Sequence, residues 1–208
     1  MTDQLKISTS FWLRRLHSLS GVFPIGVFLL EHMFTNSFIV KGAESYNEKV
    51  EFLQSLPYLV VIEIAFIAIP ILYHAFYGFY IWRTGKVNLS SYPHTKNFLY
   101  VLQRWTGLIV FAYILVHVYE TRIKDALFGT GADFARMQEI MSSPAMFWFY
   151  VIGLAATCFH FSNGLWGFCV SWGITVGNKA QRYSSIVFAA LGFAIFVSGT
   201  NSLVYLLK

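Results

Sequence analysis

The sequence predicts an all-α integral membrane bundle of five transmembrane helices, and three observations lead to this fold class. Hydrophobic residues make up 56% of the 208 residues and charged residues only 12%, about half the charged share of a soluble domain. Five apolar runs are each long enough to cross about 30 Å of hydrocarbon. The charged residues between these runs alternate between a basic side and an acidic side. We therefore expect one transmembrane domain over residues 1–208, with lipid as the solvent for its outer faces.

The five predicted spans are apolar runs bounded by polar or charged residues. They are Leu16–Thr35, Tyr58–Trp82, Tyr100–Tyr119, Ala145–Val170 and Ser185–Leu207. The first follows basic residues, as a secretion signal does, but it lacks a small-residue cleavage site and is expected to stay as a span. The polar stretch Lys41–Leu56 suits a short interfacial helix, and a second short helix is expected near Met137–Met141.

The charge distribution predicts the orientation in the membrane. One side holds nine basic residues and a single acid, Asp3, whereas the other holds six basic residues against seven acids. Because the side richer in Lys and Arg faces the cytoplasm, the N-terminus is expected inside and the C-terminus outside. The basic residues never cluster, so the net charge of +5 does not indicate nucleic-acid binding.

Histidines are the unusual feature of the spans. His17 and His94 lie at a span end and in a loop, and the other four occupy spans one to four, one on each. These four are His32, His74, His117 and His160. Ionisable groups inside a membrane are expensive and usually functional. A single one could be satisfied by a backbone carbonyl, but one on each of four spans indicates a shared purpose.

Depth along the helices sorts the four histidines into two pairs. At 1.5 Å per residue, His32 and His117 lie about 26 and 20 Å from the basic end of the bundle, and His74 and His160 lie about 13 and 16 Å from it. We call His32 and His117 the outer pair and His74 and His160 the inner pair. His117 and His160 are both near the middle, so depth alone separates these two only modestly.

Two imidazoles from different helices can bind one haem iron, one on each face of the macrocycle. Four histidines therefore predict two b-type haems. Iron with two protein ligands has no open position for oxygen, so electron transfer across the bilayer is the expected role. The two cysteines of the chain cannot supply the four thiolates of an iron–sulfur cluster.

Four glycines lie on the same helix faces as the inner histidines, where small residues would admit a haem plane or allow close helix packing. They are Gly78, Gly153, Gly164 and Gly167. Four basic groups near the inner end could bind haem propionates or simply anchor the chain at the interface. They are Arg14, Arg15, His17 and Arg104.

Glu63 is a carboxylate inside the second span. It lies eleven residues before His74, which places it on nearly the same helix face and about 16 Å further out, near the level of the outer pair. There it could relay protons to a quinone, it could be an interfacial carboxylate, or it could form a hydrogen bond to a neighbouring helix.

These residues, taken with the sequence around them, make the chain resemble the di-haem cytochrome b subunit of succinate:quinone oxidoreductase (complex II), of the single-chain, five-span b558 type found in bacilli. The resemblance covers nearly the whole chain. The matching runs include Arg14-Arg15-Leu16-His17-Ser18-Leu19, Glu31-His32, Tyr73-His74-Ala75, Val101-Leu102-Gln103-Arg104, His117 with Glu120-Thr121-Arg122, Ser142-Ser143-Pro144-Ala145-Met146, Phe159-His160-Phe161-Ser162-Asn163-Gly164-Leu165-Trp166 and Trp172-Gly173-Ile174-Thr175.

The resemblance implies a multi-pass subunit of the bacterial cytoplasmic membrane that anchors a flavoprotein and an iron–sulfur subunit. Succinate would be oxidised in the flavoprotein, and electrons would pass through an inner haem bound by His74 and His160, then an outer haem bound by His32 and His117, to a quinone, usually menaquinone. Fumarate reduction is the reverse path.

Two other functions also use intramembrane histidines. One is the cytochrome b of a hydrogenase or formate dehydrogenase, and the other is a proton or metal transporter. The sequence shows no broken helices or repeated halves that would favour a transporter.

Overall fold

The computed structural model describes residues 9–208, which are helical throughout apart from short connections. Five helical segments in this range are long and apolar enough to cross a membrane, which agrees with the predicted fold class. They are Thr9–Lys41, Leu59–Thr84, Thr95–Phe128, Pro144–Ser171 and Gly177–Tyr205. Two charges used for the orientation, Asp3 and Lys6, lie outside the described residues.

The first three spans are each interrupted, which corrects the expectation from the sequence that no helix is broken. Span one consists of α1 (Thr9–Val22) and α2 (Ile25–Asn36), followed by a 3₁₀ turn, Ser37–Lys41. Pro24 separates the two helices, because proline lacks the backbone N–H that would continue the hydrogen-bond ladder.

Span two begins as α4 (Leu59–Ile62), widens into a π-helical turn over Glu63–Ala68 and continues as α5 (Ile69–Thr84). Pro70, in the first turn of α5, cannot donate to the carbonyl one turn earlier and so favours the widening before it. Span three is interrupted in the same way: α6 (Thr95–Val118) is followed by a π-helical turn over Tyr119–Ile123 and then by α7 (Lys124–Phe128).

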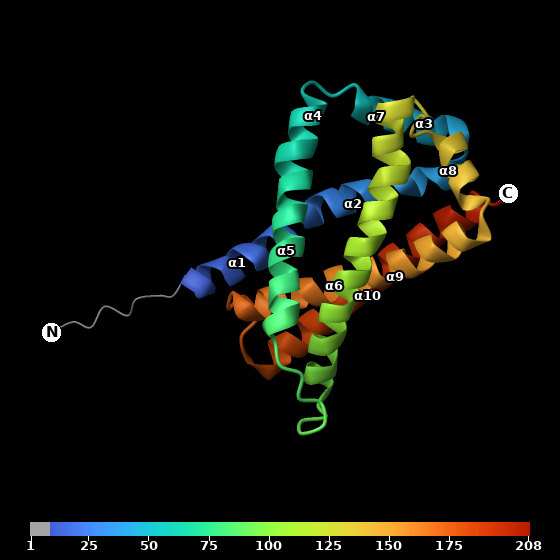
Figure 1. The fold of residues 1–208 in the computed structure, drawn as a ribbon. Helices are drawn as coiled ribbons and strands as arrows, with labels where there is room; N and C mark the ends of the chain where they lie inside the picture. Colours follow the sequence, from blue (N-terminus) through green and yellow to red (C-terminus); the bar gives the residue numbers. More distant parts are fainter. Residues whose placement is uncertain (1–8) are drawn as a thin grey trace.

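The last two spans are the uninterrupted helices α9 (Pro144–Ser171) and α10 (Gly177–Tyr205). They run side by side, and α9 also packs along α6 and against α1 (Figure 1). In the most apolar stretch of α9, 39% of the residues are buried, against 0% in span two. Helix α9 is therefore the central element of the bundle, and span two presents its apolar side chains to the lipid.

Two short helices gather at one end of the bundle, close to α7 and to the C-terminus (Figure 1). These are α3 (Ala43–Gln54) and α8 (Phe134–Met141), where the sequence predicted an interfacial helix and a short helix. Tyr46 of α3 packs against Phe134 of α8 at 6.4 Å between ring centres. Burial, helped by the Asp133 carboxylate, raises the pKa of Tyr46 to about 12, so its hydroxyl stays neutral at physiological pH.

The helices extend further than the apolar runs predicted. Span one begins at Thr9 instead of Leu16, and span three continues to Phe128 instead of ending at Tyr119. The added turns carry charged residues such as Glu120 and Lys124, which form an ion pair with each other at 2.8 Å. Hydropathy therefore locates the part of a helix that lies in lipid, whereas paired charges allow the same helix to continue beyond it.

Candidate metal centres

The four intramembrane histidines come from four different helices, α2, α5, α6 and α9. The structure brings the His74 ring beside the His160 ring, with 6.2 Å between ring centres and 85° between planes. It brings the His32 ring beside the His117 ring, at 5.7 Å and 74°. These are the same two pairs into which depth along the helices sorts them.

Each inner histidine is held by a backbone carbonyl of a neighbouring helix. The Nδ1 of His74 lies 3.0 Å from the carbonyl oxygen of His17, and the Nδ1 of His160 lies 3.0 Å from that of Gln103. The Gln103 amide in turn donates to the carbonyl of His160 at 2.9 Å. If Nδ1 carries the proton and donates it to these carbonyls, Nε2 is left with a free lone pair.

The outer histidine His117 is held by side chains instead. Its Nδ1 lies 3.3 Å from the hydroxyl oxygen of Tyr150, a residue of α9 that is only 2% exposed. The ring of Tyr113 stacks on the imidazole of His117, with 5.6 Å between centres and 26° between planes. On the other helix of this pair, Phe28 stacks on His32 at 5.5 Å.

The spacing of each pair fits two ligands of one metal ion. Two imidazoles bound to opposite sides of a metal, each through a bond of about 2.0–2.1 Å, have ring centres about 6 Å apart once the ring radii are added. Rotation about these bonds is free, so the crossed ring planes are compatible with such binding. Imidazole suits iron, and a metal-binding histidine usually donates its other N–H to a carbonyl or a similar acceptor. The donor set and its supports therefore fit haem iron.

The glycines on the histidine faces lie against side chains of neighbouring helices. A Cβ at Gly153 would come within 2.3 Å of the Tyr113 ring, and one at Gly78 within 3.2 Å of the His17 ring. A Cβ at Gly164 would meet the Gln103 amide at 3.4 Å, whereas Gly167 has nothing within 4 Å. Of the two roles considered for these glycines, admitting a haem plane or allowing close helix packing, close packing accounts for Gly153 and Gly78.

Two further glycines, which the sequence did not single out, touch the inner histidines directly. A Cβ at Gly21 would lie 2.6 Å from Cε1 of His74, and one at Gly107 would lie 3.0 Å from Cε1 of His160. Each inner imidazole thus lies directly against the backbone of a neighbouring helix.

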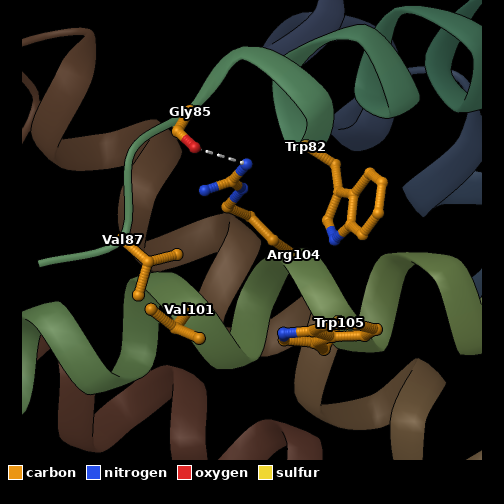
Figure 2. A pocket seen from close by; sticks show the side chains of 6 residues that line it. All are labelled: Trp82, Gly85, Val87, Val101, Arg104 and Trp105. Carbon is orange, nitrogen blue, oxygen red and sulfur yellow. Dashed lines mark hydrogen bonds between the residues drawn. The ribbon is translucent and has the colours of Figure 1, made fainter. Parts of the chain in front are cut away.

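The four basic candidates at the inner end differ in what they contact. Arg104 donates through Nη2 to the carbonyls of Ile81 at 3.1 Å and Gly85 at 3.2 Å. Its Nε and Nη1 are buried and have no hydrogen-bond partner among the described residues. The guanidinium borders a cavity of ≈ 140 Å³ together with Trp82 and Trp105 (Figure 2). Arg104 therefore has donors available for a further anion.

His17 stacks on His74 with 4.0 Å between ring centres and 17° between planes, and its buried Nδ1 has no partner in the described part of the chain. Arg15 is already engaged, because it donates to the Ser171 carbonyl and lies over the Trp172 ring at 5.3 Å. Arg14 is exposed. His17 thus lies directly against the inner pair and Arg104 has buried donors to spare, whereas Arg14 and Arg15 occupy the surface.

Glu63 forms an ion pair with Arg122, whose Nη2 and Nε lie 2.8 and 3.2 Å from the same carboxylate oxygen. The contact joins the π-helical turn of span two to that of span three. Such turns occur frequently at functional sites. Of the roles considered for Glu63, the structure shows the bond to a neighbouring helix directly.

Comparison with known proteins gives a family for this chain. Residues 83–200, more than half of the chain, match the succinate dehydrogenase/fumarate reductase transmembrane subunit family. The chain is also 48% identical over 187 residues to the succinate dehydrogenase cytochrome b558 subunit of Bacillus subtilis, covering 88% of this chain and 92% of that protein. The chain belongs to this family. These matches confirm the resemblance seen in the sequence to the transmembrane subunit of succinate dehydrogenase or fumarate reductase.

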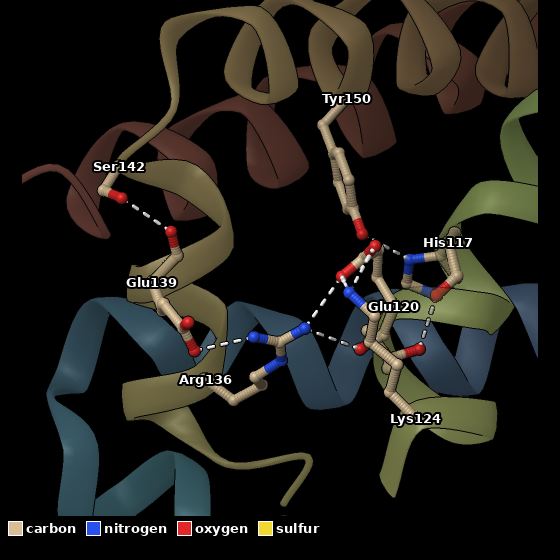
Figure 3. Close-up of polar contacts among 8 residues, drawn as sticks. His117, Glu120, Lys124, Arg136, Glu139, Ser142 and Tyr150 are labelled. Carbon is tan, nitrogen blue, oxygen red and sulfur yellow. Dashed lines mark hydrogen bonds and ion pairs between the residues drawn. The ribbon is translucent and has the colours of Figure 1, made fainter. Parts of the chain in front are cut away.

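This transmembrane subunit carries one feature near its outer histidines that the sequence did not reveal. Glu120 accepts from Lys124 at 2.8 Å and from Arg136 at 2.7 Å, and Arg136 also pairs with Glu139 at 2.6 Å. Figure 3 shows this network next to the hydroxyl of Tyr150 and the ring of His117. Glu120 is part of a run that carried the resemblance, but Tyr150 and Arg136 gave no signal. Their proximity depends on how α8 and α9 pack.

Proposed function

We propose that this chain is the membrane-anchor and electron-transfer subunit of a succinate dehydrogenase or fumarate reductase, and that it binds two b haems. The inner haem would be bound by His74 and His160, and the outer haem by His32 and His117. The observation that carries the proposal is the two facing pairs of imidazoles. The cytochrome b558 name of the 48% identical relative supports the same cofactor.

Bound at these sites, haem supplies a reversible one-electron change at iron. The chain's own residues determine where this electron transfer occurs and whether oxygen can bind at the same iron. Four helices bring the imidazoles together in two pairs, and an iron bound by both members of a pair would have no open position for oxygen. The carbonyls of His17 and Gln103 fix the inner rings through Nδ1, at 3.0 Å each, and so would leave Nε2 free to bind the metal.

Arg104 and His17 are the proposed partners of the inner haem propionates. Carboxylates pair well with guanidinium groups that have free N–H donors, and Arg104 has two buried polar atoms without partners in the described residues. Arg14 and Arg15, at the surface of the same end, fit interfacial anchoring better.

The excess of basic residues at the inner end supports a cytoplasmic location for that end. A flavoprotein and an iron–sulfur subunit would bind there, and succinate would be oxidised in the flavoprotein. Electrons would reach the inner site from the iron–sulfur subunit and leave from the outer site to a quinone, with menaquinone the expected type. The chain itself would carry out no chemistry on succinate.

The direct test is the spectrum and haem content of the complex purified with all its subunits. We expect reduced b-type absorption from two distinguishable components and two haems per chain. A preparation with intact partner subunits but no haem would contradict the proposal. One haem per chain would contradict the assignment of one of the two histidine pairs.

Glu63 is proposed to relay protons at the quinone site near the outer pair. In Glu63→Gln, which keeps the shape of the side chain but removes its charge, we expect quinone reduction to slow by roughly 100-fold, the lower end of what a positioned acid or base contributes. Both haems should remain. Turnover with a soluble quinone analogue, compared with the haem spectrum of the same sample, measures this.

The matched control for this prediction is Glu48→Gln. Glu48 is also paired with a base, Lys49 at 3.4 Å, but its side chain is 72% exposed, and its loss should leave turnover unchanged. Wild-type turnover in Glu63→Gln would mean that Glu63 serves only its ion pair with Arg122.

A further inference from the structure

His117 differs from the inner histidines in how its second ring nitrogen is held. The inner rings point Nδ1 at backbone carbonyls at 3.0 Å, which no substitution at those positions removes, and the hydroxyls of Ser20 and Thr106 lie slightly further from the same atoms, at 3.2 and 3.4 Å. His117 instead points Nδ1 at the phenol oxygen of Tyr150, at 3.3 Å. The hydrogen bond at Nδ1 of this imidazole therefore depends on one side chain.

Tyr150 is firmly positioned for such a role. It is 2% exposed and among the largest fully buried side chains of the described residues. Its ring meets Tyr113 edge-on, with 5.3 Å between centres and 89° between planes, and meets His117 at 5.6 Å and 70°. Because rings packed on several sides cannot easily turn, the hydroxyl is held where His117 needs it.

The surroundings of the hydroxyl also favour its acting as an acceptor. Figure 3 shows the Tyr150 hydroxyl and the Glu120 side chain on the same side of His117. Glu120 is fixed there by Lys124 and Arg136, at 2.8 and 2.7 Å. The negative charge of this carboxylate favours orientations in which the phenol proton faces it, which leaves the phenol oxygen free to accept from Nδ1–H.

We propose that Tyr150 is a positioning residue for the outer metal site, accepting a hydrogen bond from Nδ1–H of His117 and thereby setting the strength of His117 as an axial ligand. This rests on the proposed function. A hydrogen bond accepted from Nδ1–H makes the other nitrogen more basic, and a more basic ligand stabilises the oxidised iron. Tyr150 therefore lowers the reduction potential of the outer haem and leaves the inner haem unaffected.

The test is a redox titration, followed by absorption, of the complete complex carrying Tyr150→Phe. We expect both haems to be retained and the outer component alone to become easier to reduce, by up to tenfold in its equilibrium constant, or about 59 mV for one electron. The electron paramagnetic resonance signal of the outer haem should shift as well. Activity is not needed as a readout.

Tyr113→Phe is the matched control, because Tyr113 stacks on the same imidazole at 5.6 Å without the contact to Nδ1. It should leave both potentials at their wild-type values. The inference is overturned if Tyr150→Phe leaves the outer potential unchanged, if both haems shift equally, or if Tyr113→Phe has the same effect. A wild-type complex without two haems would instead overturn the proposed function, so the two failures are distinguishable.

If the Tyr150→Phe complex does not assemble, 3-fluorotyrosine placed at position 150 serves as the second variant. The fluorine preserves the packing of the ring and withdraws electrons from the phenol oxygen, which weakens it as an acceptor. The same upward shift of the outer potential is expected, and an unchanged potential in this variant overturns the inference.

Discussion

Replacing His74 or His160 by leucine should remove the inner haem from the complex, and replacing His32 or His117 should remove the outer one. An iron that loses one of its two protein ligands is held by a single imidazole, whose helix no longer has a partner across the macrocycle. Each variant should therefore contain one haem per chain instead of two. Haem content and the redox titration of the purified complex measure which component is missing.

Double replacements make this prediction sharper. Because His74 and His160 would bind one iron, the variant that lacks both should lose the same single haem per chain as the variant that lacks either one. Replacing His74 together with His32 should remove both haems. The effects of replacing two residues that act as a unit are expected to be non-additive in this way, whereas the effects of replacing residues of separate sites add.

His94→Leu is the control for these variants. His94 is an exposed histidine in the loop before α6 and should be replaceable without loss of haem. The pairing would be wrong if His74→Leu and His117→Leu removed the same spectral component, or if the double variant at His74 and His160 contained no haem.

The spans and the grouping of the histidines could be predicted because both follow from simple distances along the chain. An apolar run must match the thickness of the bilayer, and a helix rises by a constant 1.5 Å per residue. The depth of His32 or His160 therefore follows from its position in the sequence. The resemblance to a known family implies the same pairing, and it separates the two histidines near the middle, which depth separates only modestly.

The supports of the histidines could not be predicted in the same way. The contact of His117 with Tyr150 joins residues 33 positions apart, and it depends on how α6 and α9 are rotated about their axes. Apolar periodicity is weak in helices that are surrounded by lipid, because almost every face is hydrophobic. The same uncertainty explains why Gly153 could be placed on the face of His160 but its packing against Tyr113 could not be foreseen.

The π-helical turns are a further feature that the sequence did not reveal. The turn before Pro70 has a local cause in that proline, but no proline accompanies the turn over Tyr119–Ile123. That turn contains Glu120 and Arg122, which pair with Arg136 and Glu63 respectively. Its widening thus coincides with two charged side chains that reach in different directions, and those partners are defined only once the helices have packed.

Arg136→Met should destabilise the chain more than any other single loss of charge at the outer end. The Arg136 side chain is 8% exposed and pairs with Glu120 at 2.7 Å and Glu139 at 2.6 Å. Its removal leaves the Glu120 carboxylate, which is 19% exposed, with Lys124 as its remaining ion-pair partner. We expect a loss of about 3 kcal/mol, the lower end of the range for breaking a buried ion pair, because Lys124 still compensates part of the charge.

Thermal unfolding of the purified protein in detergent, followed by circular dichroism, measures this loss. Lys49→Met is the matched control, since Lys49 lies at the same end and pairs with Glu48 at 3.4 Å, but the side chains are 35% and 72% exposed. Exposed pairs contribute about 0–1 kcal/mol, so its unfolding temperature should barely change. Equal effects of the two substitutions would mean that water reaches Arg136 and screens its ion pairs. In that case the network could not hold Glu120 firmly beside Tyr150, and the support proposed for His117 would depend on packing alone.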